Sequence, residues 1–403
     1  PALLERTGLA GDVVLEGSWD VQALDTLRAR ATLRRASGEL RLLAIDSAGT
    51  TTVRSSGNAP ATLGKQAGAA AGLQAAQIEL ELQGERLRAA VLWDSARAGR
   101  LQAEGALLAR PGIASGVATA VSLPMLLNLI REPGQPELLR EQPHNLFALA
   151  RTSGFRSHWL SAQESKLLSH LGSRHLDVSI TREDHPLLFL KRHDHALVDL
   201  LGEQRWGERN FAVINLRTAH LPYEENYDQH NEPLPSWPVD PSLPREERQR
   251  NAYDNAIGYL DDVLAEVIAR FDQLDGERYL LITGDHGQLL GENGRWGHND
   301  LLPQVAEVPV MVLAREAPEE ALSSLRQQRW ISHHEAGLWL AERLGHRVDN
   351  PNLRPGEHFV QGKQLFGDNM IQRVREAASG LIYDRPILLS RWLEALQRET
   401  SLP

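Results

Sequence analysis

Alternating apolar and polar residues in the first quarter of the chain predict β-strands. Residues 78–83 read Ile-Glu-Leu-Glu-Leu-Gln, which is the period of two expected of a half-buried strand. The Ala- and Gly-rich stretch 59–76 is expected to form a loop or a weak helix. Similar alternation predicts further strands over residues 27–33, 40–45, 87–93 and 101–104. Short strands at near-regular spacing favour an antiparallel meander or an open β-solenoid.

The rest of the chain alternates apolar runs with amphipathic segments, which is typical of an α/β fold. Residues 211–216, 279–283 and 308–313 are apolar runs, and they are predicted to form buried, parallel strands. A long helix is predicted over residues 251–271. The reason is an apolar stripe at helical spacing, formed by Ala256, Leu260, Val263, Leu264, Val267 and Ile268.

The uncharged stretch 113–130 raises the question of a membrane span, because its length is near the lower limit for a spanning helix. However, Pro124 interrupts it, and Ser, Thr and Gly make its first half weakly apolar. A buried loop leading into a core helix is therefore predicted. The chain opens Pro-Ala-Leu-Leu-Glu-Arg, without the basic and apolar regions of a signal peptide.

Composition changes sharply near residue 110. All 15 His, all seven Phe and all six Tyr follow this position, as do all but two of the 21 Pro. The change predicts two domains, an all-β segment over residues 1–110 and an α/β domain over residues 111–403. The net charge of −10 argues against a general nucleic-acid binder, because binding phosphates needs an excess of Lys and Arg. The absence of Cys excludes a disulfide framework, a thiolate zinc site and a cysteine nucleophile.

The strongest chemical signal is an adjacent Asp-His pair. Asp285 and His286 come directly after the predicted strand 279–283, and Gly287 lets the backbone turn tightly behind them. Active sites of open α/β sheets lie at the carboxyl ends of strands. Carboxylate oxygens and imidazole nitrogens are also good zinc ligands. His298 follows after a glycine-rich loop, so these residues are the first candidates for a functional site.

Two further segments could supply reactive groups. His220 follows the predicted strand 211–216, where it could position a phosphate, bind a second metal or shuttle a proton. Thr119 could be presented at a helix N-terminus, where the N–H groups and the helix dipole favour a phosphoryl group. A hydroxyl becomes a competent nucleophile when a metal lowers its pKa. A surface-loop His and a core-facing Thr are the alternatives that need no function.

Together these motifs resemble the catalytic domain of the phosphoethanolamine transferases, within the alkaline phosphatase/sulfatase superfamily. The motifs occur in the family's order and cover most of residues 111–403: Thr119-Ala-Val-Ser-Leu-Pro, Asn251-Ala-Tyr-Asp-Asn, Asp285-His-Gly-Gln-Leu-Leu-Gly-Glu-Asn-Gly and His298. The resemblance implies a sulfatase-like sheet flanked by helices.

The resemblance also implies roles for individual residues. Thr119 matches the family's zinc-bound nucleophile, and Asp285 and His286 match the pair that holds the zinc. Residues that would steady the substrate phosphate are His220, His298 and, once one gap is allowed, Lys166.

The same resemblance implies a reaction and a setting. Thr119, activated by Zn²⁺, would take the phosphoethanolamine group from phosphatidylethanolamine and hold it as a phospho-Thr intermediate. The group would then pass to an acceptor on a glycan or on lipid A. A membrane surface is the implied partner, and the implied location is the periplasm, at the inner membrane.

The chain departs from the family pattern in several places. Ser115 and Met125 replace the family's two cysteines beside the nucleophile. Gln288 replaces a glutamate beside the metal pair, and Asn215 replaces a further histidine. The family's fourth zinc ligand is a glutamate at the end of its first strand, and neither that motif nor that strand is found. Two carboxylates in the first segment could replace it, Glu16 and Asp46.

Two rival functions stay open on the sequence. A sulfatase- or phosphodiesterase-type hydrolase would use the same residues with water as acceptor. A non-catalytic lipid-binding scaffold is the other, because the strand texture of residues 1–110 resembles the AsmA/TamB-like β-scaffold proteins, although a generic antiparallel domain explains it equally. The missing glutamate favours the scaffold. The retention of Thr119, Asp285, His286 and His298 together favours an enzyme.

Overall fold

The fold begins with an antiparallel meander, as the alternating pattern predicts. The computed structural model describes residues 9–11, 13–23, 27–38, 40–42, 73–83, 86–95, 99–165, 170–227 and 237–400. Neighbouring strands of the meander pair in the order β2 (Val14–Ala23), β3 (Leu27–Ser37), β5 (Leu73–Gln83), β6 (Arg86–Ser95) and β7 (Gly99–Ile113). A separate short pair is formed by β1 (Leu9–Gly11) and β4 (Leu40–Leu42). The remainder of the predicted strand 40–45, and most of the stretch 59–76, lie outside the described residues.

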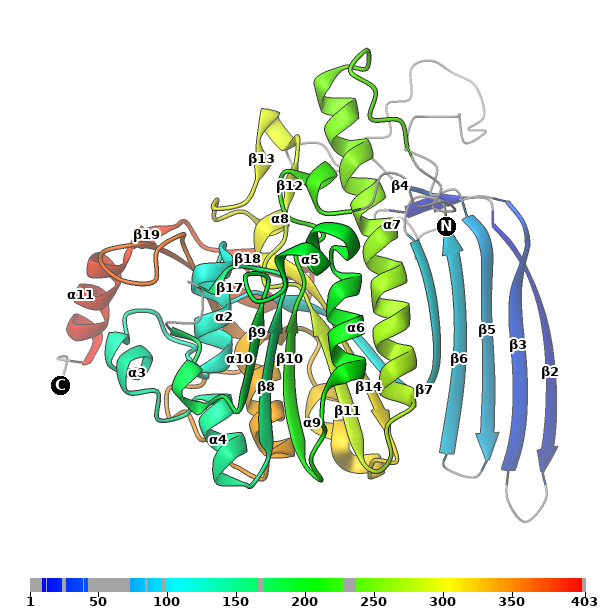
Figure 1. Ribbon diagram of the computed structural model, residues 1–403, viewed down its shortest axis with the longest axis horizontal. Coiled ribbons are helices and arrows are strands. Elements are labelled where there is room, and N and C mark those ends of the chain that lie inside the picture. Colours follow the sequence, from blue (N-terminus) through cyan, green and yellow to red (C-terminus); the bar gives the residue numbers. More distant parts are fainter. Residues whose placement is uncertain are drawn as a thin grey trace.

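Strand β7 joins this meander to the rest of the molecule. Its first half, residues 99–105, pairs with β6, and its second half, residues 106–113, pairs antiparallel with β14 (Glu307–Arg315). The short strand β15 (Ile331–Ser332) runs parallel to the end of β7. Residue 110 therefore lies inside a continuous strand. Figure 1 shows β7 between the meander and the rest of the molecule. The division into domains at this residue stays a prediction.

Strand direction corrects one expectation. Residues 279–283 and 308–313 do form neighbouring strands, but β11 (Arg278–Thr283) and β14 run antiparallel. A parallel neighbour requires a connection that crosses over the sheet. The chain between them instead forms the β12–β13 hairpin (Leu289–Leu290 and Trp296–Gly297) and the short helix α8 (Pro303–Ala306), and it returns in the opposite direction. Every residue of β11 is also only half-buried.

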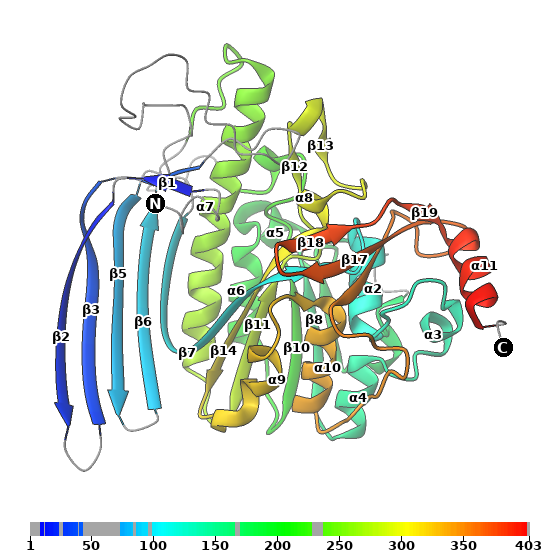
Figure 2. The same cartoon turned by 180° about the vertical axis from the view of Figure 1, so that it is seen from behind.

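A second, three-stranded sheet is parallel, as expected for residues 211–216. Its order is β10 (Asn210–Asn215), β8 (Arg156–Ser161) and β9 (Val178–Thr181). Strands β10 and β11 lie side by side in both views (Figures 1 and 2). They are not hydrogen-bonded to each other, so the two sheets remain separate within the described part of the chain.

Helices cover both faces of this region, as predicted. One layer consists of α5 (Pro186–Arg192), α6 (His195–Glu203) and α7 (Arg245–Asp272), which lies in front in Figure 1. The opposite layer contains α2 (Thr119–Leu127), α4 (Leu146–Thr152), α9 (Ser323–Arg326) and α10 (His333–Arg343), seen in Figure 2. Helix α7 contains the predicted helix 251–271, and its buried stripe includes Ala256, Val263 and Val267 but adds Tyr259 and Phe271.

The uncharged stretch 113–130 forms the end of β7, a buried loop and helix α2, as predicted. Among the described residues, none of the helices combines the length and the apolar character that a membrane crossing needs.

The chain ends in a small antiparallel sheet and a helix. The sheet contains β16 (Glu357–Gln361), β17 (Met370–Ala377), β18 (Gly380–Tyr383) and β19 (Ile387–Leu388), and it leads into α11 (Leu389–Thr400). The remaining short helices are α3 (Pro136–Glu141) and the 3-10 turns Ser173–His175, Tyr223–Glu225, Glu292–Gly294 and Glu319–Leu322.

Candidate active site

The Asp-His pair lies directly after β11, in a turn that only glycine can complete. A Cβ on Gly287 would lie 2.1 Å from the backbone carbonyl oxygen of Gln304. The Gly287 N–H also donates to the Val305 carbonyl at 2.7 Å. Close approach of two backbone segments is therefore the reason for this glycine, and the approach fixes the turn that carries Asp285 and His286.

The hydrogen bonds of His286 define its tautomer. Its Nδ1 lies 2.8 Å from the Gly287 carbonyl oxygen. A carbonyl can only accept, so Nδ1 carries the proton and Nε2 keeps a free lone pair. That Nε2 lies 3.5 Å from the Thr119 hydroxyl and 3.6 Å from Asp285 Oδ2. The three side chains therefore face a common point.

Thr119 is the first residue of helix α2, as the sequence predicts. Ala118 before it has an extended backbone and offers no capping side chain. The first N–H groups of a helix have no partner inside the helix, and the helix dipole makes this end positive. The Thr119 hydroxyl therefore lies at the positive end of a helix, next to the Asp-His pair, which is an arrangement that suits an anion.

Two further imidazoles complete a row of rings beside Thr119. The ring centroid of His298, after β13, is 4.3 Å from that of His286 and 5.7 Å from that of His220. Burial, reinforced by the two neighbouring imidazoles, lowers the pKa of His298 to about 4. With this pKa, His298 is neutral near pH 7. His220 Nδ1 donates to the Leu221 carbonyl, which leaves its Nε2 lone pair free.

Two buried polar atoms of this cluster lack a hydrogen-bond partner, namely Asp285 Oδ2 and His298 Nδ1. Buried polar atoms without a partner are rare in folded proteins and call for an explanation. A carboxylate oxygen beside the free lone pair of His286 is a donor set that suits Zn²⁺. No group of three or more His, Asp or Glu side chains gathers around one metal position in the described ranges, however. The residues therefore fit a cation in chemistry but do not complete its coordination.

Of the other sequence-predicted residues, Glu16 is described and is not in this cluster. Glu16 lies on β2, the edge strand of the meander, where it is exposed and pairs with Arg34 at 3.1 Å. It therefore does not replace the missing glutamate. Lys166 and Asp46 lie outside the described residues. Gln288, which replaces a family glutamate, donates to the Tyr223 hydroxyl at 2.8 Å.

His333 is a site residue that the sequence reasoning missed. It is fully buried, and burial lowers its pKa to about 4. Its Nε2 lies 3.0 Å from the Gly284 carbonyl and therefore carries the proton. Its Nδ1 accepts from the Ser122 hydroxyl at 3.0 Å and from the Ser115 N–H at 3.2 Å. His333 thus ties the Thr119 helix to the turn that carries Asp285.

The signal that could have revealed it is the motif Ser332-His333-His334-Glu335, because Ser followed three residues later by Glu is a helix capping box.

A curled mixed sheet between helix layers, with an Asp-His pair at a strand end and a hydroxyl at a helix N-terminus, is typical of the alkaline phosphatase/sulfatase superfamily. The family model "Sulfatase" matches residues 90–335, which is more than half of the chain. The chain therefore belongs to the sulfatase family. The match begins before residue 110 and includes the four clustered residues Thr119, His220, Asp285 and His286, together with His298.

Characterised relatives are similar at modest identity. The phosphoethanolamine transferase EptA of Helicobacter pylori is 27% identical over 232 residues, covering 52% of this chain and 43% of the relative. The low-salt glycan biosynthesis sulfotransferase Agl7 of Haloferax volcanii is 30% identical over 209 residues, covering 48% of this chain and 43% of the relative. The phosphoethanolamine transferase EptC of Escherichia coli is 25% identical, covering 38% of this chain and 28% of the relative. The chain spans less than half the length of these relatives.

Solved structures of the same superfamily are also similar in outline. The phosphonate monoester hydrolase of Silicibacter pomeroyi matches with a TM-score of 0.42 and 14% identity, covering 71% of this chain and 85% of that one. The phosphoglycerol transferase of Streptococcus pyogenes, solved with sn-glycerol-1-phosphate, matches with a TM-score of 0.37 and 12% identity, covering 61% and 72%. The family model and the two phosphoethanolamine transferase relatives, rather than these structures, confirm the predicted superfamily and the resemblance.

Proposed function

We propose that the protein transfers a phosphoethanolamine-type group from a phospholipid to an envelope glycan or lipid acceptor. The observation that carries the proposal is the convergence of Thr119, at a helix N-terminus, with the free Nε2 of His286 and the orphaned carboxylate oxygen of Asp285. The similarity to two phosphoethanolamine transferases supports the choice of group.

The residues of the cluster divide the reaction into two displacements. Thr119 Oγ1 would attack the phosphorus of phosphatidylethanolamine, and the bond from phosphorus to the diacylglycerol oxygen would break. The Thr119 proton would end on the departing diacylglycerol oxygen, because the Nε2 lone pair of His286 that faces Thr119 is the one that would hold the metal. An acceptor hydroxyl would then attack the phospho-Thr, and the bond to Thr119 would break with return of its proton.

Zn²⁺ bound by Asp285 and His286 would supply Lewis acidity that lowers the pKa of the Thr119 hydroxyl. The chain's own contributions are binding and orientation. The N–H groups at the start of α2 and the neighbouring rings of His220 and His298 would surround the phosphate oxygens. A periplasmic location at the membrane surface is part of the proposal, because the donor is a lipid.

The first prediction concerns the nucleophile. Thr119→Ala is expected to lower release of diacylglycerol from phosphatidylethanolamine vesicles by at least about 10³-fold, because the attacking oxygen is gone. Thr119→Ser keeps a hydroxyl and should retain part of the rate. Thr152→Ala, an exposed Thr in α4, is the matched control and should leave turnover unchanged. Equal turnover in Thr119→Ala and wild type contradicts the proposal.

The second prediction concerns the metal. After metal removal and reconstitution, the protein is expected to hold about one Zn²⁺ per chain, and Asp285→Ala and His286→Ala should lose it. Zinc content measured by elemental analysis tests this without an activity assay. Binding that is weak in wild type and unchanged in Asp285→Ala would indicate a relic site and favour the non-catalytic scaffold.

A hydrolase of the same superfamily is the second candidate, favoured by the match to the family model "Sulfatase". Water would then take the place of the acceptor. Turnover of p-nitrophenyl phosphate or sulfate esters, without turnover of phosphatidylethanolamine, would select the hydrolase.

A further inference from the structure

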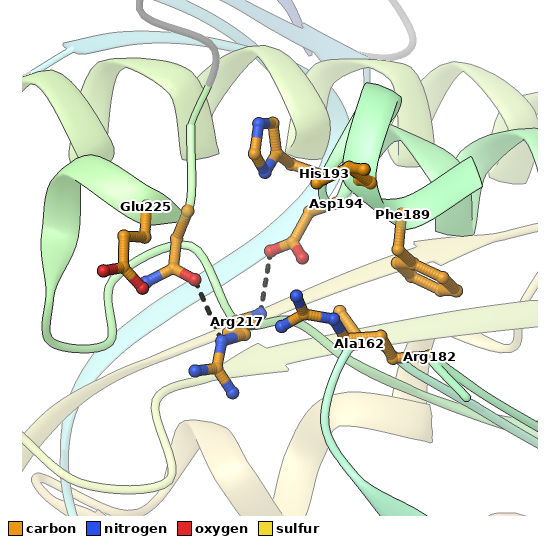
Figure 3. Close-up of a pocket in the computed structure, with 9 residues that line it drawn as sticks. Ala162, Arg182, Phe189, His193, Asp194, Arg217 and Glu225 are labelled. Atoms are coloured by element: carbon orange, nitrogen blue, oxygen red, sulfur yellow. Dashed lines mark hydrogen bonds between the residues drawn. The ribbon is translucent and has the colours of Figure 1, made fainter. Parts of the chain in front are cut away.

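A small hollow opens at the carboxyl ends of the three parallel strands. Ala162 follows β8, Arg182 follows β9 and Arg217 lies two residues beyond β10, and all three line it. Its cavity volume is about 50 Å³, which suits a small polar group better than a whole lipid. Carboxyl ends of parallel strands are the usual place for ligands in open α/β sheets. Figure 3 shows the hollow with its lining residues.

Two guanidinium groups reach this hollow. Figure 3 shows those of Arg182 and Arg217 on the same side of the Asp194 carboxylate. The side chain of Arg182 is half-buried, yet it has neither a hydrogen bond nor an ion pair with any residue that the structure describes. A partly buried Arg normally has a partner, because its five N–H donors are costly to leave unpaired. Arg182 is therefore available to a ligand.

Arg217 is held in place but still has unused hydrogen-bond donors. Its Nε donates to Asn226 at 2.9 Å, and one terminal nitrogen lies 3.5 Å from Glu164. The other terminal nitrogen makes no hydrogen bond or ion pair with a described side chain. Arg forks of this kind bind phosphate oxygens in pairs.

Three carboxylates lie in or beside the hollow, against its two guanidinium groups. Asp194 is fully buried and accepts from the Thr218 hydroxyl and from the N–H groups of Arg217 and Thr218. Glu225 is exposed at the edge of the hollow, and Glu164 is the 3.5 Å neighbour of Arg217. One wall is apolar, because Phe189 is buried there and Leu190 is 65% exposed. Among the described residues Arg182 has no bonded carboxylate, so the hollow combines one unpaired guanidinium group with an apolar wall.

The hollow is connected to the candidate active site by Asn226. This side chain accepts from Arg217 Nε and donates to the His220 carbonyl at 2.7 Å and to the Pro222 carbonyl at 2.9 Å. His220 in turn contacts His298, whose ring lies beside His286. A group bound to Arg217 would therefore lie one hydrogen-bonded residue away from the active-site loop.

We propose that this hollow binds a phosphate monoester group of the acceptor through Arg182 and Arg217. That the bound group belongs to the acceptor rests on the proposed transferase function, whereas phosphate binding itself does not. Two guanidinium groups match the charge and the several oxygens of a phosphate monoester, and the apolar wall fits the carbon skeleton that bears it. The phosphate can come from a glycan or from a lipid head group.

Calorimetric titration of the full chain tests the site with three probes: inorganic phosphate, glucose 1-phosphate and phosphatidylcholine vesicles containing phosphatidic acid. Arg182→Gln is expected to weaken binding by about 10- to 100-fold, since it removes a charge-assisted contact. It breaks no bond with the described residues, so it should fold normally. Arg182→Lys should lose most of the affinity, because a point charge cannot pair two oxygens at once.

Controls separate this hollow from the active site. His286→Ala should keep phosphate binding, and Arg347→Gln, an equal charge change at an exposed position, should leave it unchanged. Weakening of the glucose 1-phosphate titration by Arg182→Gln supports a glycan-borne phosphate, and weakening of the vesicle titration supports a lipid-borne one. The proposal is overturned if Arg182→Gln and Arg217→Gln leave the binding of all three probes unchanged. It is also overturned if phosphate binding is lost only in His286→Ala.

The two proposals can fail separately. Phosphate binding that depends on Arg182, in a protein that releases no diacylglycerol, would leave the site in place and reject the transferase. Thr119-dependent release of diacylglycerol, with phosphate binding that depends on neither arginine, would support the transferase and reject the phosphate site.

Discussion

His333 connects two parts of the candidate site that are distant in sequence. Its three hydrogen bonds reach Ser115 and Ser122 on the Thr119 side and Gly284 on the Asp285 side. Each ring nitrogen has one role, because the carbonyl must accept from Nε2 and both other partners donate to Nδ1. A fully buried imidazole with this pattern holds the nucleophile and the Asp-His turn at a fixed separation. We regard it as a positioning residue.

His333→Ala is expected to lower kcat for phosphatidylethanolamine by roughly 10- to 100-fold with a smaller change in KM, because small displacements of reacting groups are costly. His333→Gln keeps a donor for the Gly284 carbonyl and should restore part of kcat. Ser122→Ala removes one of the three hydrogen bonds and serves as the milder control. Loss of kcat that merely follows loss of folded protein, in all three variants, would show that His333 affects stability alone.

At the scale of elements, the N-termini of two helices position residues of the candidate site. Thr119 is the first residue of α2, and His333 is the first residue of α10. The start of α10 is fixed by a capping box, in which the Ser332 hydroxyl accepts from the Glu335 N–H and the Glu335 carboxylate accepts from the Ser332 N–H. Such a cap determines which residue occupies the first turn. The position of His333 therefore depends on Ser332.

Ser332→Ala is expected to lower the free energy of unfolding by about 1 kcal/mol, the usual contribution of a serine cap. Urea unfolding followed by circular dichroism measures it. Thr152→Ala is the matched control, because the Thr152 hydroxyl donates to a carbonyl of its own helix and caps nothing, so a change below about 0.5 kcal/mol is expected. An unchanged midpoint for Ser332→Ala would contradict the role of the cap.

At the scale of the whole molecule, the packing of sheets and helix layers leaves several histidines buried in the described part of the chain. His334, next to His333 in α10, is 3% exposed, and burial lowers its pKa from 6.5 to about 4. The nearby Glu132 opposes this shift but does not overcome it. His334 is therefore neutral in the folded protein at pH values where the unfolded chain is already protonated.

This difference predicts acid sensitivity. Between pH 6.5 and pH 4 the unfolded state binds a proton that the folded state does not, so the free energy of unfolding falls as the pH is lowered through this range. The slope is about 1.4 kcal/mol per pH unit for one such group, or on the order of 3 kcal/mol in total. The contribution is fully present above pH 6.5. Urea unfolding at a series of pH values, with His334→Leu for comparison, tests it: the variant should show a shallower slope, and an identical slope would exclude His334 as a cause.

The candidate site was predictable from local signals. Each motif is recognisable from a short stretch of sequence: an Asp-His pair after an apolar run, and a hydroxyl before an apolar helix. The same residues come together in the structure. Thr119, His220, Asp285, His286 and His298 were named from the sequence. Their catalytic roles stay predictions. His333 and the two arginines of the hollow could not be named, because nothing in their immediate neighbourhood shows that distant strands and helices meet there.

The sequence by itself determined where strands and helices form, because periodicity records which side of each element is buried. It determined the meander, the long helix α7 and the chemistry at the ends of β10 and β11. Only the tertiary structure decided that β14 runs antiparallel to β11, that β7 continues from one sheet region into the next, and that His286 keeps a free Nε2. Strand direction, continuity and hydrogen-bond partners are set by contacts between residues far apart in the chain, and local patterns carry no record of those contacts.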